Sequence, residues 1–412
     1  MVCVTMQFFS NVIFFITDEL DFDYLLFSIL IKLVLMKKKI LIVYPGFPHY
    51  RKGIIEALIA DKDFEFYFIG DETMMNSSIN PYTFRNRDRF THIPSHYIGP
   101  FLFHKKLLGY INANNFDGYI FHSAPFWITI YIAVFIAKFK RKPILNWTHG
   151  ILYKPRSIQS FVFKLFYKPF DGFLLYGNYA KENMIRQGFA PENLIVINNS
   201  LDYESQVQFR KLISNDMLLS FKASLFKDPQ LSQLLFIGRL YPQKKLEMLI
   251  DVFHLLHNEG HKFNLLIVGN GIEKNKLQYK VEGYGLADYV NFYGPSYNES
   301  DNFKLIASSD CCISPGEVGL TAIHSMMYGT PVISHDRFDK QMPEFEAIIS
   351  GYCGGYFKYN DLQSLKDSIL EWFSSDLSRE TIRLNCYERV DSVFNPMFQK
   401  RMIKSAFSLF KA

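Results

Sequence analysis

Residues 308–334, SSDCCISPGEVGLTAIHSMMYGTPVIS, decide the fold because they are typical of strand, loop, helix, turn and strand in direct succession. The apolar run Cys311–Ser314 predicts a buried strand, and Val332 begins a second one. Between them, apolar residues on one face predict a helix over 320–328, with Gly329 as its stop. A helix that starts after such a loop presents unpaired N–H groups. The stretch could therefore bind an anion such as a diphosphate, or be an ordinary βαβ turn.

The same alternation continues over most of the chain. We predict further strands at 40–44, 64–70, 118–121, 143–147, 173–176, 234–237, 263–268 and 290–294, and helices at 53–60, 246–256 and 396–410. Strands that alternate with crossover-length segments indicate parallel sheets covered by helices on both faces. At 412 residues the chain is long enough for two such domains.

Two loops in the second half complete a recognisable set of motifs. Gly238-Arg239-Leu240 followed by Lys244 comes after one predicted strand, and Gly269-Asn270-Gly271 after the next. With Gly319-Leu320 and 329–333, they resemble the GT-B glycosyltransferases, in particular the retaining family four, also called glycosyl transferases group 1. The resemblance is dense over 234–365 and thinner over 40–202. It implies an α/β fold of two Rossmann-like domains whose parallel sheets face each other across a cleft, with a C-terminal helix crossing back to the first domain.

The sequence departs from the family at one motif. The family's paired glutamates, eight positions apart, fall on Gly316 and His324, and the only nearby acid is Glu317. We expect Glu317 to take the role near the donor sugar. We expect His324 to take the position that contacts the ribose, where a neutral imidazole accepts fewer hydrogen bonds than a carboxylate.

The resemblance predicts three groups of site residues. The catalytic candidates are Arg239, Lys244, Glu317 and His149; the donor-binding candidates are Gly238, Gly269, Asn270, Gly319, Leu320, Thr321 and His324; and the candidates for the acceptor or cleft loop are Gly46, His49 and Arg51. Two cations suit a leaving nucleoside diphosphate, whose negative charge grows as the glycosidic bond breaks. With the helix start they can carry that charge, so we expect no metal and no cofactor besides the nucleotide diphosphate sugar.

The first-domain candidates have simpler alternatives. His149 follows the strand at 143–147, at the end where α/β sheets place ligands, but it could also be a packed loop histidine. His49 and Arg51 precede the first helix and could form a solvated basic turn.

Residues 101–170 carry charge of one sign. They contain ten Lys or Arg against a single acid, Asp117, and aromatic and aliphatic residues lie among them. Basic amphipathic helices of this kind suit an anionic membrane surface, although a solvated face is the alternative. No recognised nucleic-acid motif accompanies them, so we expect no nucleic-acid partner.

Residues 1–35 are hydrophobic, but Asp18, Glu19, Asp21 and Asp23 interrupt them before the length of a membrane span is reached. Because Met36 directly precedes the first predicted strand, we expect 1–35 to be an extra segment, either a misassigned start or an amphipathic anchor. The domains expected after it are 36–202 with 396–412 for the acceptor, a linker with an irregular helix at 203–230, and 231–395 for the donor. Five cysteines at unrelated spacings give no zinc or disulfide pattern, which fits a reducing cytoplasm.

These features together predict a glycosyltransferase. It would move a sugar from a nucleotide diphosphate sugar to a hydroxyl of a lipid-linked saccharide, in polysaccharide or lipopolysaccharide biosynthesis, at the inner face of the plasma membrane. The family resemblance implies retention of configuration without a metal. Two alternatives share the architecture: a nucleotide-sugar 2-epimerase, and a non-catalytic subunit that binds a partner transferase.

Overall fold

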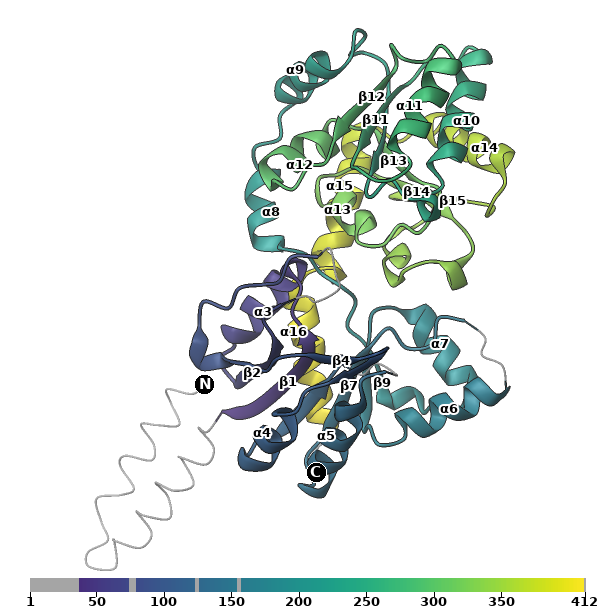
Figure 1. The fold of residues 1–412 in the computed structure, drawn as a ribbon. Coiled ribbons are helices and arrows are strands. Elements are labelled where there is room, and N and C mark those ends of the chain that lie inside the picture. The colour runs from purple at the N-terminus through teal and green to yellow at the C-terminus, as the bar shows by residue number, and fades with distance from the viewer. Residues whose placement is uncertain (1–36, 74–78, 123–125, 154–156, 411–412) are drawn as a thin grey trace, which may run out of the picture.

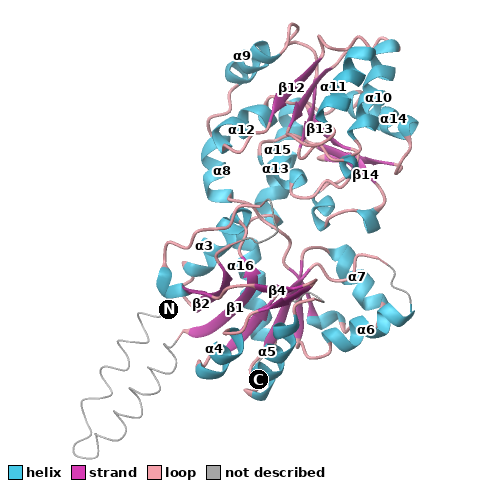
Figure 2. Ribbon diagram, viewed as in Figure 1, coloured by secondary structure: helices cyan, strands magenta, loops and turns pink. Residues whose placement is uncertain are grey.

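Two parallel sheets organise the chain, one in each half (Figures 1 and 2). The computed structural model describes residues 37–73, 79–122, 126–153 and 157–410. The segment 1–35, and with it the expectation of a misassigned start or an anchor, lies outside the described residues. Among the described residues, no helix combines the length and the apolar character that crossing a membrane requires.

The first sheet has seven strands in the order β3-β2-β1-β6-β7-β8-β9. They are β1 (Lys38–Gly46), β2 (Phe64–Asp71), β3 (Phe90–His92), β6 (Gly118–Phe121), β7 (Ile144–Thr148), β8 (Gly172–Leu175) and β9 (Leu194–Val196). Its helices are α3 (Lys52–Ile59), α4 (Leu107–Ala113), α5 (Ile128–Phe139), α6 (Ser157–Tyr167) and α7 (Asn178–Arg186). A separate antiparallel hairpin joins β4 (His96–Ile98) to β5 (Phe101–Phe103).

The second sheet has six strands in the order β12-β11-β10-β13-β14-β15. They are β10 (Gln233–Ile237), β11 (Asn264–Val268), β12 (Val290–Gly294), β13 (Cys311–Ser314), β14 (Val332–His335) and β15 (Gly354–Phe357). Its helices are α10 (Leu246–Asn258), α11 (Lys274–Gly283), α12 (Glu299–Ala307), α13 (Thr321–Met327), α14 (Leu362–Phe373) and α15 (Arg379–Val393). Short 3-10 turns are η2 (His49–Arg51), η3 (Arg87–Arg89), η4 (Pro191–Asn193), η5 (Pro242–Lys244), η6 (Phe338–Lys340) and η7 (Pro343–Ala347).

Three of the predicted strands are confirmed with the bounds that the sequence predicted. β6, β12 and β13 begin and end at the predicted residues. Gly329, at φ +77°, ends the helix before β14, as its position predicted. Continuous apolar strands suit a sheet that is covered on both faces, and the buried side chains form a core on each face of the first sheet and one around the second.

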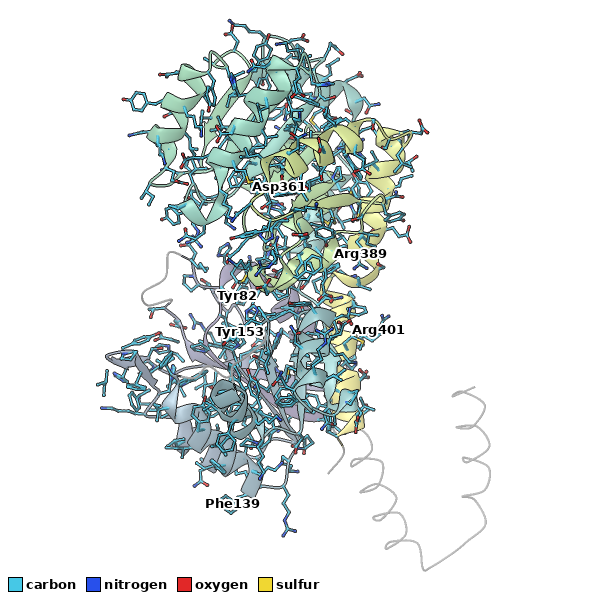
Figure 3. The ribbon with its side chains drawn as sticks, turned by 90° about the vertical axis from the view of Figure 1, so that its right-hand side faces the viewer. Tyr82, Phe139, Tyr153, Asp361, Arg389 and Arg401 are labelled. Atoms are coloured by element: carbon cyan, nitrogen blue, oxygen red, sulfur yellow. The ribbon has the colours of Figure 1, made fainter. Side chains whose placement is uncertain are left out.

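The last helix, α16 (Pro396–Leu409), crosses back to the first domain as expected (Figure 1). It packs against α3 and buries Ile403, Ala406 and Phe407 in the core around β1. Gly118 permits this approach, because a Cβ there would lie 2.4 Å from the Phe407 ring. In Figure 3, Arg389 and Arg401 mark the helices that lead from one domain to the other.

Residues 203–230, expected to be a linker with one irregular helix, contain two helices, α8 (Tyr203–Arg210) and α9 (Asn215–Leu225). Both contact α12, and Leu218 and Phe226 belong to the core of the second domain. The apolar pattern of the sequence did not predict two separate helices here, because each helix buries only one of its residues.

Candidate active site

The two domains meet where their strands end. After β14, the turn η7 places two glutamates against the first domain. Glu344 accepts a hydrogen bond from the Asn199 amide at 2.8 Å. Glu346 accepts from the backbone N–H groups of Asn178 at 2.7 Å and Tyr179 at 2.6 Å, at the N-terminus of α7. Gly177 makes room for this carboxylate, since a Cβ there would lie 2.4 Å from its Oε1 atom. The start of α7, which follows β8, is therefore held against η7 of the second domain.

On the second domain, two cations follow β10. Arg239 is exposed, and Lys244 lies in η5 with its Nζ donating to the Glu317 carbonyl at 2.5 Å. Burial lowers the pKa of Lys244; Glu317 and Glu344 oppose this shift, and the neighbouring Arg239 adds to it. Two cations held this close in a partly buried site favour an anionic ligand.

The glycine loops beside these cations pack backbone against backbone. Gly269 has φ +149°, and a Cβ there would lie 1.8 Å from the Gly238 carbonyl oxygen. The Leu240 N–H donates to the Asn270 carbonyl at 2.9 Å. The Asn270 side chain is exposed, and its Oδ1 accepts from the Gly271 N–H at 2.9 Å. These glycines thus bring the ends of β10 and β11 into contact.

The structure gives a physical reason for the departure at Gly316. A Cβ at this position would lie 2.0 Å from the Gln243 carbonyl oxygen and 2.7 Å from the Lys244 Cα. No side chain fits there while the Lys244 loop keeps its place. The acid one position later, Glu317, has an exposed side chain and acts electrostatically on Lys244.

The start of α13 lies beside the same strand end. Gly319 adopts φ +54°, Leu320 is the N-cap residue, and the Thr321 hydroxyl donates to the Ile237 carbonyl at 3.2 Å. This bond ties the predicted donor-binding residues of α13 to the last residue of β10 and so to the loop that carries Arg239.

His324, one turn further on, has a partner that sequence reasoning missed. Its Nε2 lies 2.8 Å from Oε1 of Glu299, which also accepts from the Tyr328 hydroxyl at 2.5 Å and the Gln206 amide at 3.0 Å. Burial opposes ionisation of Glu299, but His324 and these hydrogen bonds lower its pKa to about 2. Of the two ring nitrogens, Nδ1 is the one left to serve the role expected of His324 toward a ribose.

On the first domain, Arg51 lies in a cage of aromatic rings at the strand ends. Its side chain is buried, with 6% of the residue exposed. The guanidinium carbon lies 4.9 Å from the ring centroids of Tyr44 and Trp147 and 5.4 Å from that of Tyr176. Its Nη2 donates to the Tyr176 hydroxyl, which is 3.3 Å from the Tyr44 hydroxyl. The alternative of a solvated turn is therefore wrong for Arg51.

Two histidines complete this cage. His149 lies 4.7 Å from the Tyr176 ring, and His122, which the sequence analysis did not single out, stacks on Tyr44 at 4.2 Å. Burial, and next the charge of Arg51, lower the pKa of His149 to about 4 and that of His122 to about 3. Both rings are neutral at pH 7. The signal for His122 was its place directly after β6, at the end of the sheet that carries ligands.

The other two candidates of the first loop lie differently. His49 is exposed, and its Nδ1 is 3.1 Å from the Asn80 carbonyl oxygen. Gly46 is the last residue of β1, where the register with β2 shifts. Of the predicted loop residues, Arg51 is the one that the structure places among the strand-end aromatics.

Comparison with known proteins shows which family the second half of the chain matches. Residues 220–389 match the family described as Glycosyl transferases group 1. Alpha-monoglucosyldiacylglycerol synthase of Streptococcus pneumoniae is 24% identical over 239 residues, covering 49% of this chain and 52% of that protein. The amylovoran biosynthesis glycosyltransferase AmsD of Erwinia amylovora is 26% identical over 157 residues, covering 38% and 40%. The chain thus aligns with about half the length, or less, of these relatives.

A solved structure extends the likeness to both domains. The Anabaena protein HepE, in complex with UDP and glucose, superposes with a TM-score of 0.63 at 18% identity, covering 90% of this chain and 99% of that one. The two parallel-sheet domains and the crossing C-terminal helix therefore form a GT-B fold.

Proposed function

We propose that this chain is a glycosyltransferase, because residues 220–389 match the glycosyl transferases group 1 family and the chain has the GT-B fold. It moves a sugar from a nucleotide diphosphate sugar, held at the end of the second sheet, to a hydroxyl of an acceptor held by the first domain. The observation that carries this proposal is the pair Arg239 and Lys244 beside Glu317.

The electrostatics of that pair support a diphosphate ligand. Lys244 is partly buried next to a second cation, and both effects lower its pKa. A diphosphate between Arg239 and Lys244 would relieve their repulsion, and the gain grows when the leaving group acquires its charge. The two cations therefore stabilise the transition state more than the ground state, which is what lowers the barrier.

We extend the proposal to the steps that the family resemblance implies. Transfer retains the anomeric configuration, and Arg239 and Lys244 take the place that a metal has in other transferases. Glu317 and His149 approach the donor sugar from opposite domains. Since His149 is neutral at pH 7, its ring can donate one hydrogen bond and accept another.

The acceptor that we propose is a lipid-linked saccharide, reached from an anionic membrane at the inner face of the plasma membrane. Support comes from apolar side chains exposed along the hairpin, α5 and α6: Ile98, Phe101, Phe126, Ile132, Phe135, Phe139, Phe161, Val162 and Leu165. These elements are neighbours, since α5 contacts β5 and its Tyr131 ring lies 4.5 Å from Phe166 of α6. An apolar surface of this extent is a marker of an interaction site.

Cations border the end of this surface, where Figure 3 labels Phe139. Lys138, Arg141 and Lys142 line a cavity of about 410 Å³ together with Asp171, Leu409 and Phe410. Lys140, by contrast, donates to the carbonyls of Asn112 and Asn114 at 3.0 and 2.8 Å, away from that cavity. An apolar surface edged by cations suits the interface of an anionic bilayer.

Flotation with lipid vesicles tests the membrane part. The wild type should bind vesicles that contain anionic lipid, less so as salt rises, since each surface cation contributes about 1 kcal/mol. Replacing Arg141 and Lys142 by Gln should reduce binding about 10-fold or more, whereas Lys140→Gln should have little effect. Binding that is independent of salt and of Arg141 and Lys142 would contradict this part alone.

A binding screen tests the transferase itself. We expect one uridine or guanosine diphosphate sugar to raise the melting temperature, because a ligand that binds only the folded state stabilises it by mass action. The shift should be lost in an Arg239→Ala, Lys244→Ala double variant. The absence of any shift across the screen counts against the proposed function.

A further inference from the structure

Unsatisfied polar atoms gather in the cage around Arg51. Four buried side-chain nitrogens there find no hydrogen-bond partner among the described residues: Nε and Nη1 of Arg51, Nε1 of Trp147 and Nδ1 of His149. Buried polar groups in native proteins are nearly always paired. Several unpaired nitrogens in one place therefore call for an explanation.

The charge of Arg51 points the same way. Among the described residues, no carboxylate oxygen lies within ion-pair distance of its guanidinium. The nearby acid is Glu344, which is bonded to Asn199 and whose pKa is raised by burial. His122 and His149 are neutral at pH 7, so they do not compensate the cation. A buried charge without an ionic partner is costly, and the three aromatic rings offset only part of that cost.

The position of the cage connects it to the donor side. The Glu344 carboxyl is affected by the charges of both Arg51 and Lys244. Glu344, which is bonded to Asn199 of the first domain, is thus within electrostatic range of both the cage and Lys244. An anionic group that enters between the domains would meet donors from both.

We infer that Arg51, with the N–H of Trp147 and the ring of His149, forms a binding site for a substrate phosphate group. Arg51 supplies the charge, and its unpaired Nε and Nη1 supply hydrogen bonds. The rings of Tyr44, Trp147 and Tyr176 hold its guanidinium in place. This inference rests on the proposed function and specifies its substrate. The phosphate has two possible sources: the diphosphate of the donor, or the phosphate that joins an acceptor saccharide to its lipid.

Calorimetric titration of the full chain distinguishes these sources. UDP, with GDP as the alternative nucleotide, reports the donor diphosphate, and uridine or guanosine serves as the ligand without phosphate. Inorganic phosphate, titrated into protein saturated with the nucleotide, reports the acceptor source. The variants are Arg51→Met and Arg51→Lys, and the control is Arg87→Met, a surface arginine of the same domain that pairs with Glu72.

If the donor supplies the phosphate, Arg51→Met should weaken nucleotide binding at least 10-fold and leave nucleoside binding unchanged. If the acceptor supplies it, nucleotide binding should stay as in the wild type, and binding of inorganic phosphate should weaken at least 10-fold. In either case Arg51→Lys, which keeps the charge but loses the planar fork, should show a smaller loss, and Arg87→Met should show none.

Trp147→Phe guards against a variant of Arg51 that fails to fold, because it removes one N–H and keeps an aromatic ring. We expect it to weaken the same ligand about 3-fold, and its melting temperature reports whether the fold is intact. The inference is overturned if folded Arg51 and Trp147 variants bind nucleotide and phosphate like the wild type. Nucleotide binding by the wild type would then leave the proposed function standing, whereas a wild type that binds neither ligand contradicts both.

Discussion

The two faces that meet between the domains hold their cations in different ways. On the second domain, the cations Arg239 and Lys244 come from a single loop, and the exposed acid Glu317 lies beside them. On the first domain, one buried cation, Arg51, is held by rings from three separate strand ends. The loop on the second domain places two cations in one partly exposed site. The cage on the first domain fixes the orientation of a single guanidinium. Under the proposed function, the cation pair of the second domain would stabilise the leaving diphosphate, and Arg51 of the first domain would bind a substrate phosphate.

The largest effect should come from the second face. Arg239→Ala and Lys244→Ala should each reduce transfer or donor hydrolysis about 100-fold, because each removes charge stabilisation that grows in the transition state. The control is Lys245→Ala, since Lys245 bonds to Asn360 and lies 3.4 Å from the Tyr359 ring centroid. Near-normal turnover in both variants would place the donor elsewhere.

A lower pH should reduce the stability that depends on the two buried histidines of the first face. When the chain unfolds, His122 and His149 regain an ordinary pKa near 6.5. Their folded pKa values are about 3 and about 4, so the unfolded chain binds protons that the folded cage does not. The free energy of unfolding should thus fall by about 2 kcal/mol for each histidine, about 4 kcal/mol together, from pH 7 to pH 5. Urea unfolding of the wild type and His149→Gln measures this; equal pH slopes would contradict it.

Gly316→Ala tests whether the donor site needs the close packing of the Gly316 backbone against the Lys244 loop. Its Cβ would overlap the backbone of Gln243 and displace Lys244. We expect donor hydrolysis to fall about 10-fold, which corresponds to about 1.4 kcal/mol in the barrier. Gly355→Ala is the matched control, because a Cβ there meets nothing within 4 Å. If both variants are equally active, the Lys244 loop does not need its present place.

The smallest effect concerns the contact between the faces. Glu346→Ala removes the carboxylate that accepts two N–H groups at the start of α7. The loss of such a cap costs about 1 kcal/mol, so the free energy of unfolding should fall by that amount. Glu192→Ala, which removes an exposed glutamate of the first domain, should change it little. An unchanged stability in Glu346→Ala would mean that this contact does not hold the domains together.

The two faces also differ in how far the sequence predicted them. The loops with Gly238, Arg239 and Gly269 could be predicted because their residues are adjacent in the chain and the glycine spacing reflects a close backbone approach. The strand β13 and the helix after it were equally local. For such elements, apolar pattern and turn residues contain most of the information.

The cage around Arg51 could not be predicted in this way. Tyr44, Arg51, His122, Trp147 and Tyr176 come from four strand ends and one turn, and each is unremarkable within its own segment. Only the parallel order of β1, β6, β7 and β8 brings them together. The contact between Glu299 and His324 is similar, since 25 residues separate the two and the packing of α12 and α13 against α8 brings them together.

The release of UDP or GDP from its sugar nucleotide by the purified wild-type protein would show whether this chain is a glycosyltransferase. We predict slow release without an acceptor, faster release with one, and loss of both in Lys244→Ala. Release accompanied by a free sugar epimerised at carbon 2 would identify an epimerase. Nucleotide-sugar binding without any release or transfer would identify a non-catalytic subunit, and either result would contradict the account.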